Sequence, residues 1–213
     1  MKFYEKILLD LESEEHTMRT VYGHAFAFSD ETAFEYSAGS VIHKISYSGC
    51  RREILRICGI LKEHITQDTI VALIMKNSPL WVECFWAVLM AGGRVMPLSE
   101  DMTYTMLAGC MRNSGCRLIL GDRKAPDCTN IPVSVLEKEA PSKPVENEPE
   151  SGWGDEIILS TSATTGEPVL YSYTGSQICA QILNSGYVLK HCKDISRFWK
   201  GQFRMLAFLP FCH

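Results

Sequence analysis

Residues 69–98 read TIVALIMKNSPLWVECFWAVLMAGGRVMPL, and this stretch decides the fold. Its first part, residues 69–75, is a continuous apolar run bounded by Asp68 and Lys76. A short run of this kind is typical of a strand that is covered on both faces, as in a parallel sheet. Residues 94–98 return as a second strand, so the stretch predicts a strand, a connecting helix and another strand.

The segment between these two strands has the pattern of a buried helix. Ser78 can cap its first turn, and Pro79 fits the first helical position, where a missing N–H costs nothing. Gly92 and Gly93 supply the left-handed conformation that ends a helix. Apolar residues recur at helical spacing in between, namely Trp81, Phe85, Val88 and Leu89. This spacing indicates that the aromatic residues belong to the core and not to a cofactor site.

Further segments continue the alternation of strands and helices. We expect helices over about 48–63, 102–114 and 176–190, and strands over 117–120, 169–173 and 205–209. Nearer the N-terminus we expect an amphipathic helix over 3–16 and short strands at 25–28 and 32–36. Strands that alternate with helices favour right-handed crossovers in a parallel sheet. The predicted fold class is therefore α/β, with a mostly parallel sheet flanked by helices.

The chain is predicted to have three parts. Residues 1–136 form an N-terminal α/β subdomain, and residues 153–213 begin a second sheet region that is incomplete at its C-terminus. Between them, residues 137–152 contain five glutamates and three prolines, which predicts a solvated linker. The acid cluster could also hold a metal ion, but the flanking prolines favour the linker.

Composition excludes several classes of protein. With 213 residues, of which 46% are hydrophobic, the chain can bury a core. A formal net charge of −4 and scattered Lys and Arg give no basic surface for nucleic acid. No apolar run reaches the roughly 18 residues of a membrane helix, and the N-terminus lacks the pattern of a signal peptide. We therefore expect a cytoplasmic protein.

Nine cysteines are present, but no two have Cys-x-x-Cys spacing. An odd number without metal-binding spacing argues against both a disulfide framework and a zinc site. Cys58, Cys84 and Cys110 fall within helical patterns, where a cysteine behaves as a small hydrophobic residue. We expect them to be reduced and buried.

The best indication of function is the segment DEIILSTSATTGEP at residues 155–168, where an apolar strand runs into a loop rich in hydroxyl groups. Gly166 permits a positive φ that lets neighbouring backbone N–H groups converge on one point. Four hydroxyl donors precede it, at Thr161, Ser162, Thr164 and Thr165. Such a loop suits a phosphate chain, although an ordinary surface turn has a similar composition.

Two common phosphate-binding motifs do not fit. A P-loop requires lysine after its second glycine, whereas Glu167 follows Gly166 here. The chain contains no Gly-x-Gly-x-x-Gly, and Gly152 and Gly154 precede a strand and not a helix.

The loop resembles the signature Thr-Ser-Gly-Thr-Thr-Gly-x-Pro-Lys-Gly of the adenylate-forming superfamily. This superfamily includes acyl-CoA synthetases, nonribosomal peptide synthetase adenylation domains and luciferases. The match runs from Thr161 to Pro168. Residues 77–98 are similar to an early helix–strand segment of the family, and residues 209–213, LPFCH, to its later Leu-Pro-x-x-His strand end. The resemblance extends from about Ile45 onward.

The resemblance implies an N-terminal subdomain, truncated, of an enzyme that uses ATP and Mg²⁺. A small-molecule carboxylic acid would attack the α-phosphate of ATP, and the acyl-adenylate would then pass to CoA or to the pantetheine of an acyl-carrier protein. By the match, His213 would lie beside the acyl group and the α-phosphate. The β- and γ-phosphates would be held by Thr161, Ser162, Ala163, Thr164, Thr165 and Gly166.

The chain departs from the family pattern in three places. Ala163 replaces the first glycine, and Val169-Leu170 replaces Lys-Gly, which removes a cation close to the triphosphate. The chain also stops at His213, before the later acidic, ribose-binding and lysine motifs of the family. We therefore expect this fragment to be inactive alone. A degenerate homologue that binds an acyl group, a nucleotide or a partner, and an unrelated α/β interaction module, remain as alternatives.

Overall fold

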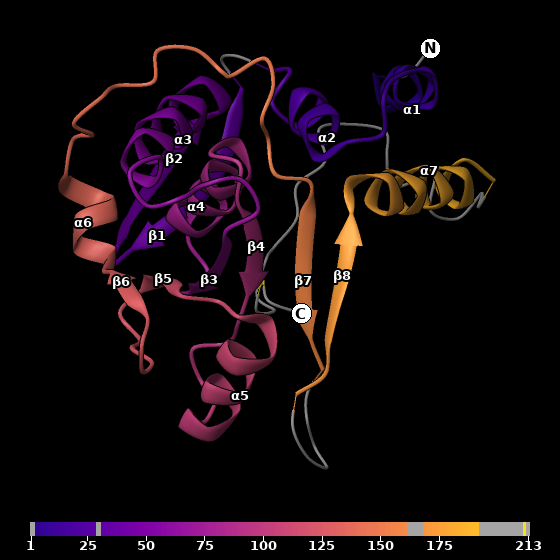
Figure 1. The fold of residues 1–213 in the computed structure, drawn as a ribbon. Coiled ribbons are helices and arrows are strands. Elements are labelled where there is room, and N and C mark those ends of the chain that lie inside the picture. Colours follow the sequence, from indigo (N-terminus) through magenta and orange to yellow (C-terminus); the bar gives the residue numbers. More distant parts are fainter. Residues whose placement is uncertain (1–2, 29–30, 162–167, 192–210, 212–213) are drawn as a thin grey trace.

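The structure is a computed structural model that describes residues 3–28, 31–161, 168–191 and 211. Its centre is a six-stranded sheet with helices on both faces, and a separate two-stranded hairpin packs beside it (Figure 1). The predicted fold class, α/β with a mostly parallel sheet flanked by helices, is confirmed.

The strand order of the sheet is β6-β5-β3-β4-β7-β8. Its strands are β3 (Ile70–Ile74), β4 (Arg94–Pro97), β5 (Leu118–Gly121), β6 (Thr129–Ile131), β7 (Glu156–Ser160) and β8 (Leu170–Thr174). All neighbouring strands are parallel except β7 and β8, which form an antiparallel hairpin. The two strands of residues 69–98, β3 and β4, lie at the centre and are buried on both faces, as their continuous apolar runs predict.

Helices cover both faces of this sheet. α3 (Tyr47–Leu61) and α4 (Pro79–Met90) pack on one face, and α5 (Tyr104–Ser114) packs on the other (Figure 1). The predicted start of α4 is confirmed, because the Ser78 hydroxyl accepts a hydrogen bond from the Trp81 N–H at 3.2 Å. Its predicted end is confirmed as well, since Gly92 has a φ of +96°.

The N-terminal region differs from the prediction. Two helices occur here, α1 (Phe3–Ser13) and α2 (Met18–Ala25), and the strand predicted at residues 25–28 is wrong because α2 runs through Ala25. Thr17 caps α2, and the buried ring of Tyr22 stacks on Phe26 with centroids 4.7 Å apart. These contacts make residues 18–25 helical despite their β-branched and aromatic residues. The strand predicted at 32–36 is confirmed as part of the hairpin of β1 (Thr32–Ala38) and β2 (Val41–Ser46).

Two short elements beyond β5 were not predicted, the strand β6 and the helix α6 (Val133–Lys138). The guanidinium of Arg56 on α3 donates to the backbone oxygens of Leu136 and Glu139 at the end of α6. A cation at the C-terminal end of a helix satisfies carbonyl groups that the helix itself leaves unpaired. A contact between residues this far apart in the sequence gives no local signal.

Residues 139–155 contain no helix or strand, and part of this segment packs against α3. The Glu148 carboxylate accepts hydrogen bonds from Arg51 of α3 at 2.5 Å and from the Tyr22 hydroxyl at 3.1 Å. Pro141 packs so closely on Gly59 that a Cβ there would lie 2.8 Å from the proline ring. The division of the chain at residues 137–152 stays a prediction.

Asp155 connects the N-terminal ends of two helices to the start of β7. Its Oδ1 accepts a hydrogen bond from the N–H of Met18, the first residue of α2, at 2.7 Å. Its Oδ2 accepts one from Gly175, the first residue of α7 (Gly175–His191), at 3.3 Å. Both N–H groups belong to the set that a helix leaves without internal partners, and a negative charge is favoured there.

Replacing Asp155 with alanine is expected to lower the free energy of unfolding by about 1–3 kcal/mol, because the Met18 N–H loses its charged acceptor while the Gly175 N–H keeps the Asp155 backbone oxygen at 2.9 Å. Urea denaturation measures the change. Asp155→Asn is the matched control, since it keeps one acceptor oxygen without the charge and should lose about half as much. Equal stability of the wild-type and alanine proteins would contradict this role.

None of the helices in the described residues combines the length and the apolar character needed to span a membrane.

Candidate functional site

The hydroxyl-rich loop joins β7 to β8, and its two ends are held together by backbone pairing. The Thr161 N–H donates to the Val169 oxygen at 2.9 Å, and the Val169 N–H donates to the Thr161 hydroxyl at 3.2 Å. A hydroxyl that accepts one hydrogen bond can still donate its own proton. Thr161 therefore closes the base of the loop and keeps a donor for a ligand.

The second end of the loop is also fixed to α5. Pro168 is buried, and its oxygen accepts a hydrogen bond from the Asn113 side-chain amide at 3.2 Å. Its ring packs on Gly109, where a Cβ would lie 3.1 Å from the proline Cδ. Thr161 and Pro168, the two described residues next to this segment, are therefore both held by hydrogen bonds.

The loop begins at the edge of the sheet where the parallel strands end. In open α/β sheets, ligands bind in the crevice outside the carboxyl ends of the strands. β3 and β7 flank β4, so their carboxyl ends lie about 10 Å apart. Segments that follow these two strands can therefore contact one ligand of the size of a nucleotide.

Asn77, three residues beyond β3, holds the C-terminal segment at this edge. Its Oδ1 accepts a hydrogen bond from the N–H of Phe211 at 3.0 Å. The Phe211 ring makes an edge contact with Trp81 of α4, with centroids 5.2 Å apart. Phe211 precedes His213 by two residues, so the chain approaches the end of β3 just before that histidine.

One of the seven site residues predicted from the sequence falls within the described part of the chain. Thr161 lies at the carboxyl end of β7. The other six lie outside the described residues: Ser162, Ala163, Thr164, Thr165, Gly166 and His213. Their roles stay predictions.

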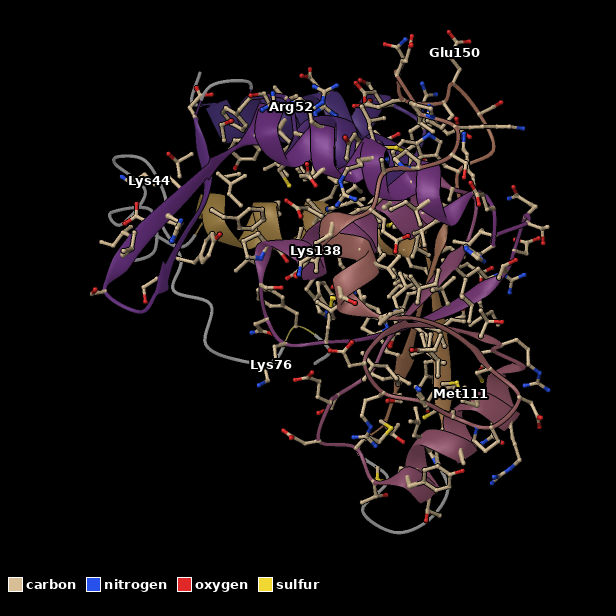
Figure 2. All side chains as sticks on the ribbon, turned by 90° about the vertical axis from the view of Figure 1, so that its left-hand side faces the viewer. Lys44, Arg52, Lys76, Met111, Lys138 and Glu150 are labelled. Atoms are coloured by element: carbon tan, nitrogen blue, oxygen red, sulfur yellow. The ribbon has the colours of Figure 1, made fainter. Side chains whose placement is uncertain are left out.

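Two further residues at this edge had no role in the sequence prediction, Lys76 and Asn77. Both follow β3 and are exposed, and Figure 2 labels Lys76. The sequence does contain an indication of this placement, because a lysine and an asparagine follow the apolar run directly. Residues that follow the buried strands of a parallel sheet lie along the edge where ligands bind. Lys76 also provides a positive charge at the edge where Val169 replaces a lysine of the family signature.

The described cysteines do not form a nucleophilic site. Seven are free thiols, and six of these are buried. Burial raises the pKa of Cys58 and Cys116 to about 11 and the pKa of Cys50 and Cys84 further. A protonated thiol is a poor nucleophile and a poor metal ligand. The expectation that Cys58, Cys84 and Cys110 are core residues is confirmed, and their reduced state stays a prediction. Across the described ranges, no group of three or more His, Cys, Asp or Glu could hold a metal ion.

Comparison with known proteins gives consistent matches. The model of the family described as "AMP-binding enzyme" matches residues 23–213. Bacitracin synthase 3 of Bacillus licheniformis is 29% identical over 129 residues, which are 59% of this chain and 2% of that protein.

Two solved structures share the fold. The N-terminal subdomain of Klebsiella oxytoca NpsA matches with a TM-score of 0.65 and 18% identity, over 76% of this chain and 43% of that one. The O-succinylbenzoate coenzyme A synthetase of Bacillus subtilis, in complex with AMP, matches with a TM-score of 0.56 and 17% identity, over 70% of this chain and 40% of that one. The chain thus spans less than half of each of these two solved structures.

Proposed function

Because the chain belongs to the AMP-binding enzyme family, we propose that it forms the N-terminal part of an ATP-dependent, AMP-forming acid ligase. In this proposal the ligase activates a small-molecule carboxylic acid as an acyl-adenylate and transfers the acyl group to a thiol, either CoA or the pantetheine of an acyl-carrier protein. A cytoplasmic location is part of the proposal, since ATP and these acceptors are available there.

The hairpin of β7 and β8 is the observation that carries the proposal. It presents the segment Thr161–Pro168, which matches the family signature, at the carboxyl edge of a parallel sheet. Thr161 and Pro168 are both held in place by hydrogen bonds to neighbouring elements.

The residues of this loop fit a triphosphate by their chemistry. Hydroxyl and amide donors bind phosphate oxygens without placing a buried cation in the site. The proposed phosphate contacts come from Thr161, Ser162, Thr164 and Thr165, and from the backbone N–H groups at Ala163 and Gly166. ATP would supply the adenylyl group that turns the acid into a reactive mixed anhydride, with pyrophosphate as the leaving group, and Mg²⁺ would offset the charge that neutral donors leave uncompensated.

His213 is the proposed residue beside the reacting groups. Phe211, two residues before it in the sequence, contacts Asn77 and Trp81 near the end of β3. An imidazole placed there could orient the acid carboxylate or donate to the oxygen that develops negative charge.

Exchange of labelled pyrophosphate into ATP tests this function. The chain joined to the downstream part of its parent protein is expected to show exchange that depends on a carboxylic acid. The 213 residues alone are expected to stay at background, because they span less than half of the solved relatives. Exchange that stays at background in the longer protein with every acid tried would reject the ligase.

A second candidate function is a homologue that binds a nucleotide or an acyl group without catalysis. The observation in its favour is Val169, which is 51% exposed at the base of the loop, where the family signature has lysine. Titration calorimetry that shows ATP binding to a longer protein without exchange would support this candidate.

Val169→Lys restores the cation and is expected to tighten ATP binding about five- to tenfold, because one exposed charge near a phosphate contributes about 1 kcal/mol. Calorimetry with ATP measures the change. Val169→Gln has a similar length without the charge and should leave the affinity close to that of the wild-type protein. Equal effects of lysine and glutamine would show that the loop does not hold the triphosphate next to residue 169.

A further inference from the structure

β8 is the last strand of the sheet, and its outer side has no neighbouring strand among the described elements (Figure 1). The side chains that point to one face of it are exposed, at 51% for Val169, 53% for Tyr171 and 37% for Tyr173. Residues 169–174 contain no charge and no proline. Natural proteins protect an edge strand with charges, prolines or bulges, because an unprotected edge accepts another strand.

The pairing of β8 with β7 determines which backbone groups face outward. Hydrogen bonds join Thr161 to Val169 at one end and Asp155 to Gly175 at the other. Alternate residues of an antiparallel pair bond to the partner strand, so the odd-numbered residues of β8 direct their N–H and C=O groups to β7. Leu170, Ser172 and Thr174 direct theirs outward.

Both ends of the outward edge are closed to a further strand. Pro168 has no N–H, and its oxygen accepts a hydrogen bond from Asn113. The Thr174 N–H donates to the Gln177 side chain at 3.0 Å. Leu170 and Ser172 are therefore the two residues in the described part of β8 that can bond fully to an added strand.

We propose that β8 pairs antiparallel with β8 of a second copy of this chain, related by a two-fold axis through Tyr171. In this register Leu170 lies opposite Ser172 of the second copy and Ser172 opposite its Leu170. Each of these pairs exchanges two backbone hydrogen bonds. No other register pairs both open residues of one strand with both open residues of the other.

The same register matches the side chains. Tyr171 lies opposite Tyr171 of the second copy, and Val169 lies opposite its Tyr173, so the exposed apolar face meets itself along its whole length. Aromatic pairs and pairs of an aromatic with a β-branched residue stabilise neighbouring strands. A two-fold contact brings the same segment of both chains together, so any charge in it would face a like charge. Residues 169–174 carry no charge, and electrostatic repulsion between the two strands is therefore absent. The result is one continuous sheet across two chains.

Analytical ultracentrifugation of the 213-residue chain over roughly a hundredfold range of concentration tests the proposal. The expected mass of the dimer is twice the 24.0 kDa of one chain. Ser172→Pro removes an outward N–H but no hydrogen bond to β7, so it should give a monomer. Ser172→Ala is the matched control. It also lacks the hydroxyl that donates to Glu156, but it keeps the N–H and should remain dimeric.

A second variant keeps the test valid if proline perturbs the strand. Tyr171→Lys places two positive charges opposite each other on the two-fold axis, on a side chain that is exposed in the single chain, and should give a monomer with unchanged circular dichroism. Tyr171→Phe should remain dimeric. A wild-type chain that is monomeric throughout, or a dimer that persists in both Ser172→Pro and Tyr171→Lys, would overturn the proposal.

A cysteine pair tests the register itself. Residues that face each other in a non-hydrogen-bonded pair have Cα atoms about 4.5 Å apart, which a disulfide can span. With oxidised glutathione as oxidant, two Tyr171→Cys chains should form one intermolecular disulfide and release two reduced glutathione molecules. Tyr173→Cys should not link to itself, because it lies opposite Val169. Equal linking at positions 171 and 173, or linking that also occurs in the wild-type chain, would overturn the register.

Discussion

Replacing Gly154 with alanine is expected to lower the free energy of unfolding by at least about 3 kcal/mol, the range of severe substitutions with an identified steric cause. A Cβ on Gly154 would lie 1.7 Å from the backbone oxygen of Gly93 and 2.7 Å from its carbonyl carbon. The obstacle is main chain and cannot rotate away. The substitution must therefore move the start of β7 away from the turn between α4 and β4.

That movement also breaks a hydrogen bond, because the Gly154 N–H donates to the Leu89 oxygen at the end of α4 at 2.7 Å. β7 pairs with β4 through Val95 and Ile157, close to the displaced point, and the hairpin that carries the loop is attached to β7. We expect the loss to appear in chemical denaturation and as weaker nucleotide binding in any longer protein that binds ATP.

Gly23→Ala is the matched control for Gly154→Ala. Gly23 lies in α2, and a Cβ there would meet no atom within 4 Å. Alanine at this position should stabilise the protein by up to about 1 kcal/mol, because it has the higher helix propensity. Alanine should thus lower the free energy of unfolding at Gly154 and raise it at Gly23. A loss of less than about 1 kcal/mol for Gly154→Ala would show that β7 is not held against the α4–β4 turn.

The stability of the protein is expected to fall between about pH 4.5 and pH 7 because of one buried carboxyl group, Glu83 of α4. Its side chain is 5% exposed, and its Oε1 has no hydrogen-bond partner in the described structure. Burial, and next the charge of Glu53, raise the pKa of Glu83 to about 7. A hydrogen bond from the Cys50 thiol and the charge of Arg56 act in the opposite direction.

The direction of this change in stability with pH follows from proton binding. Between the ordinary pKa of 4.5 and the folded value of about 7, the folded protein keeps the proton that the unfolded chain has released. Stability therefore decreases as pH rises through this window and levels off above it, with a total change of about 3 kcal/mol. The contribution of Glu83 is fully present below pH 4.5 and lost above pH 7.

Glu83→Gln isolates this effect, because glutamine has nearly the same shape and does not titrate. The stability of the variant relative to the wild-type protein should grow by about 3 kcal/mol from pH 4.5 to pH 8. Urea denaturation at several pH values measures the difference. Glu53→Gln removes the nearby negative charge and should make the pH-dependent loss of stability that Glu83 causes smaller. Parallel curves for Glu83→Gln and the wild-type protein would contradict the raised pKa of this buried carboxyl group.

The centre of the fold could be predicted because its signals are local. The apolar run at 69–75, the Ser78 cap and the Gly92 end each act within a few residues, and all three are confirmed. The strand predicted at 169–173 and the helix predicted at 176–190 are also confirmed, as β8 and α7.

The elements that sequence reasoning missed depend on distant contacts. α2 begins at Met18, whose N–H is paired with Asp155, 137 residues away. The end of α6 is held by Arg56, about 80 residues earlier in the chain. The antiparallel direction of β8 follows from the closure of the hairpin by Thr161 and Val169 and was not predicted. The periodicity of apolar residues describes one segment at a time, so it gives no information about contacts between distant segments.

The candidate site was predicted by composition and resemblance, and only Thr161 can be compared with the structure. Its hydroxyl accepts a hydrogen bond from Val169 across the base of the loop, a role that no spacing rule indicates. Lys76 and Asn77 were not among the predicted site residues, because their nearness to β7 follows from the order of strands in the sheet, which places the end of β3 two positions from β7.

The carboxylate of Asp155 has a consequence for biosynthesis. Translation proceeds from the N-terminus, so the Met18 N–H is made long before its acceptor exists. α1 and α2 acquire their contacts with Asp155 and α7 only after those residues have left the ribosome. Contacts between residues so far apart in sequence form late and slowly. Until then, the side of α2 that packs on α7 has no partner.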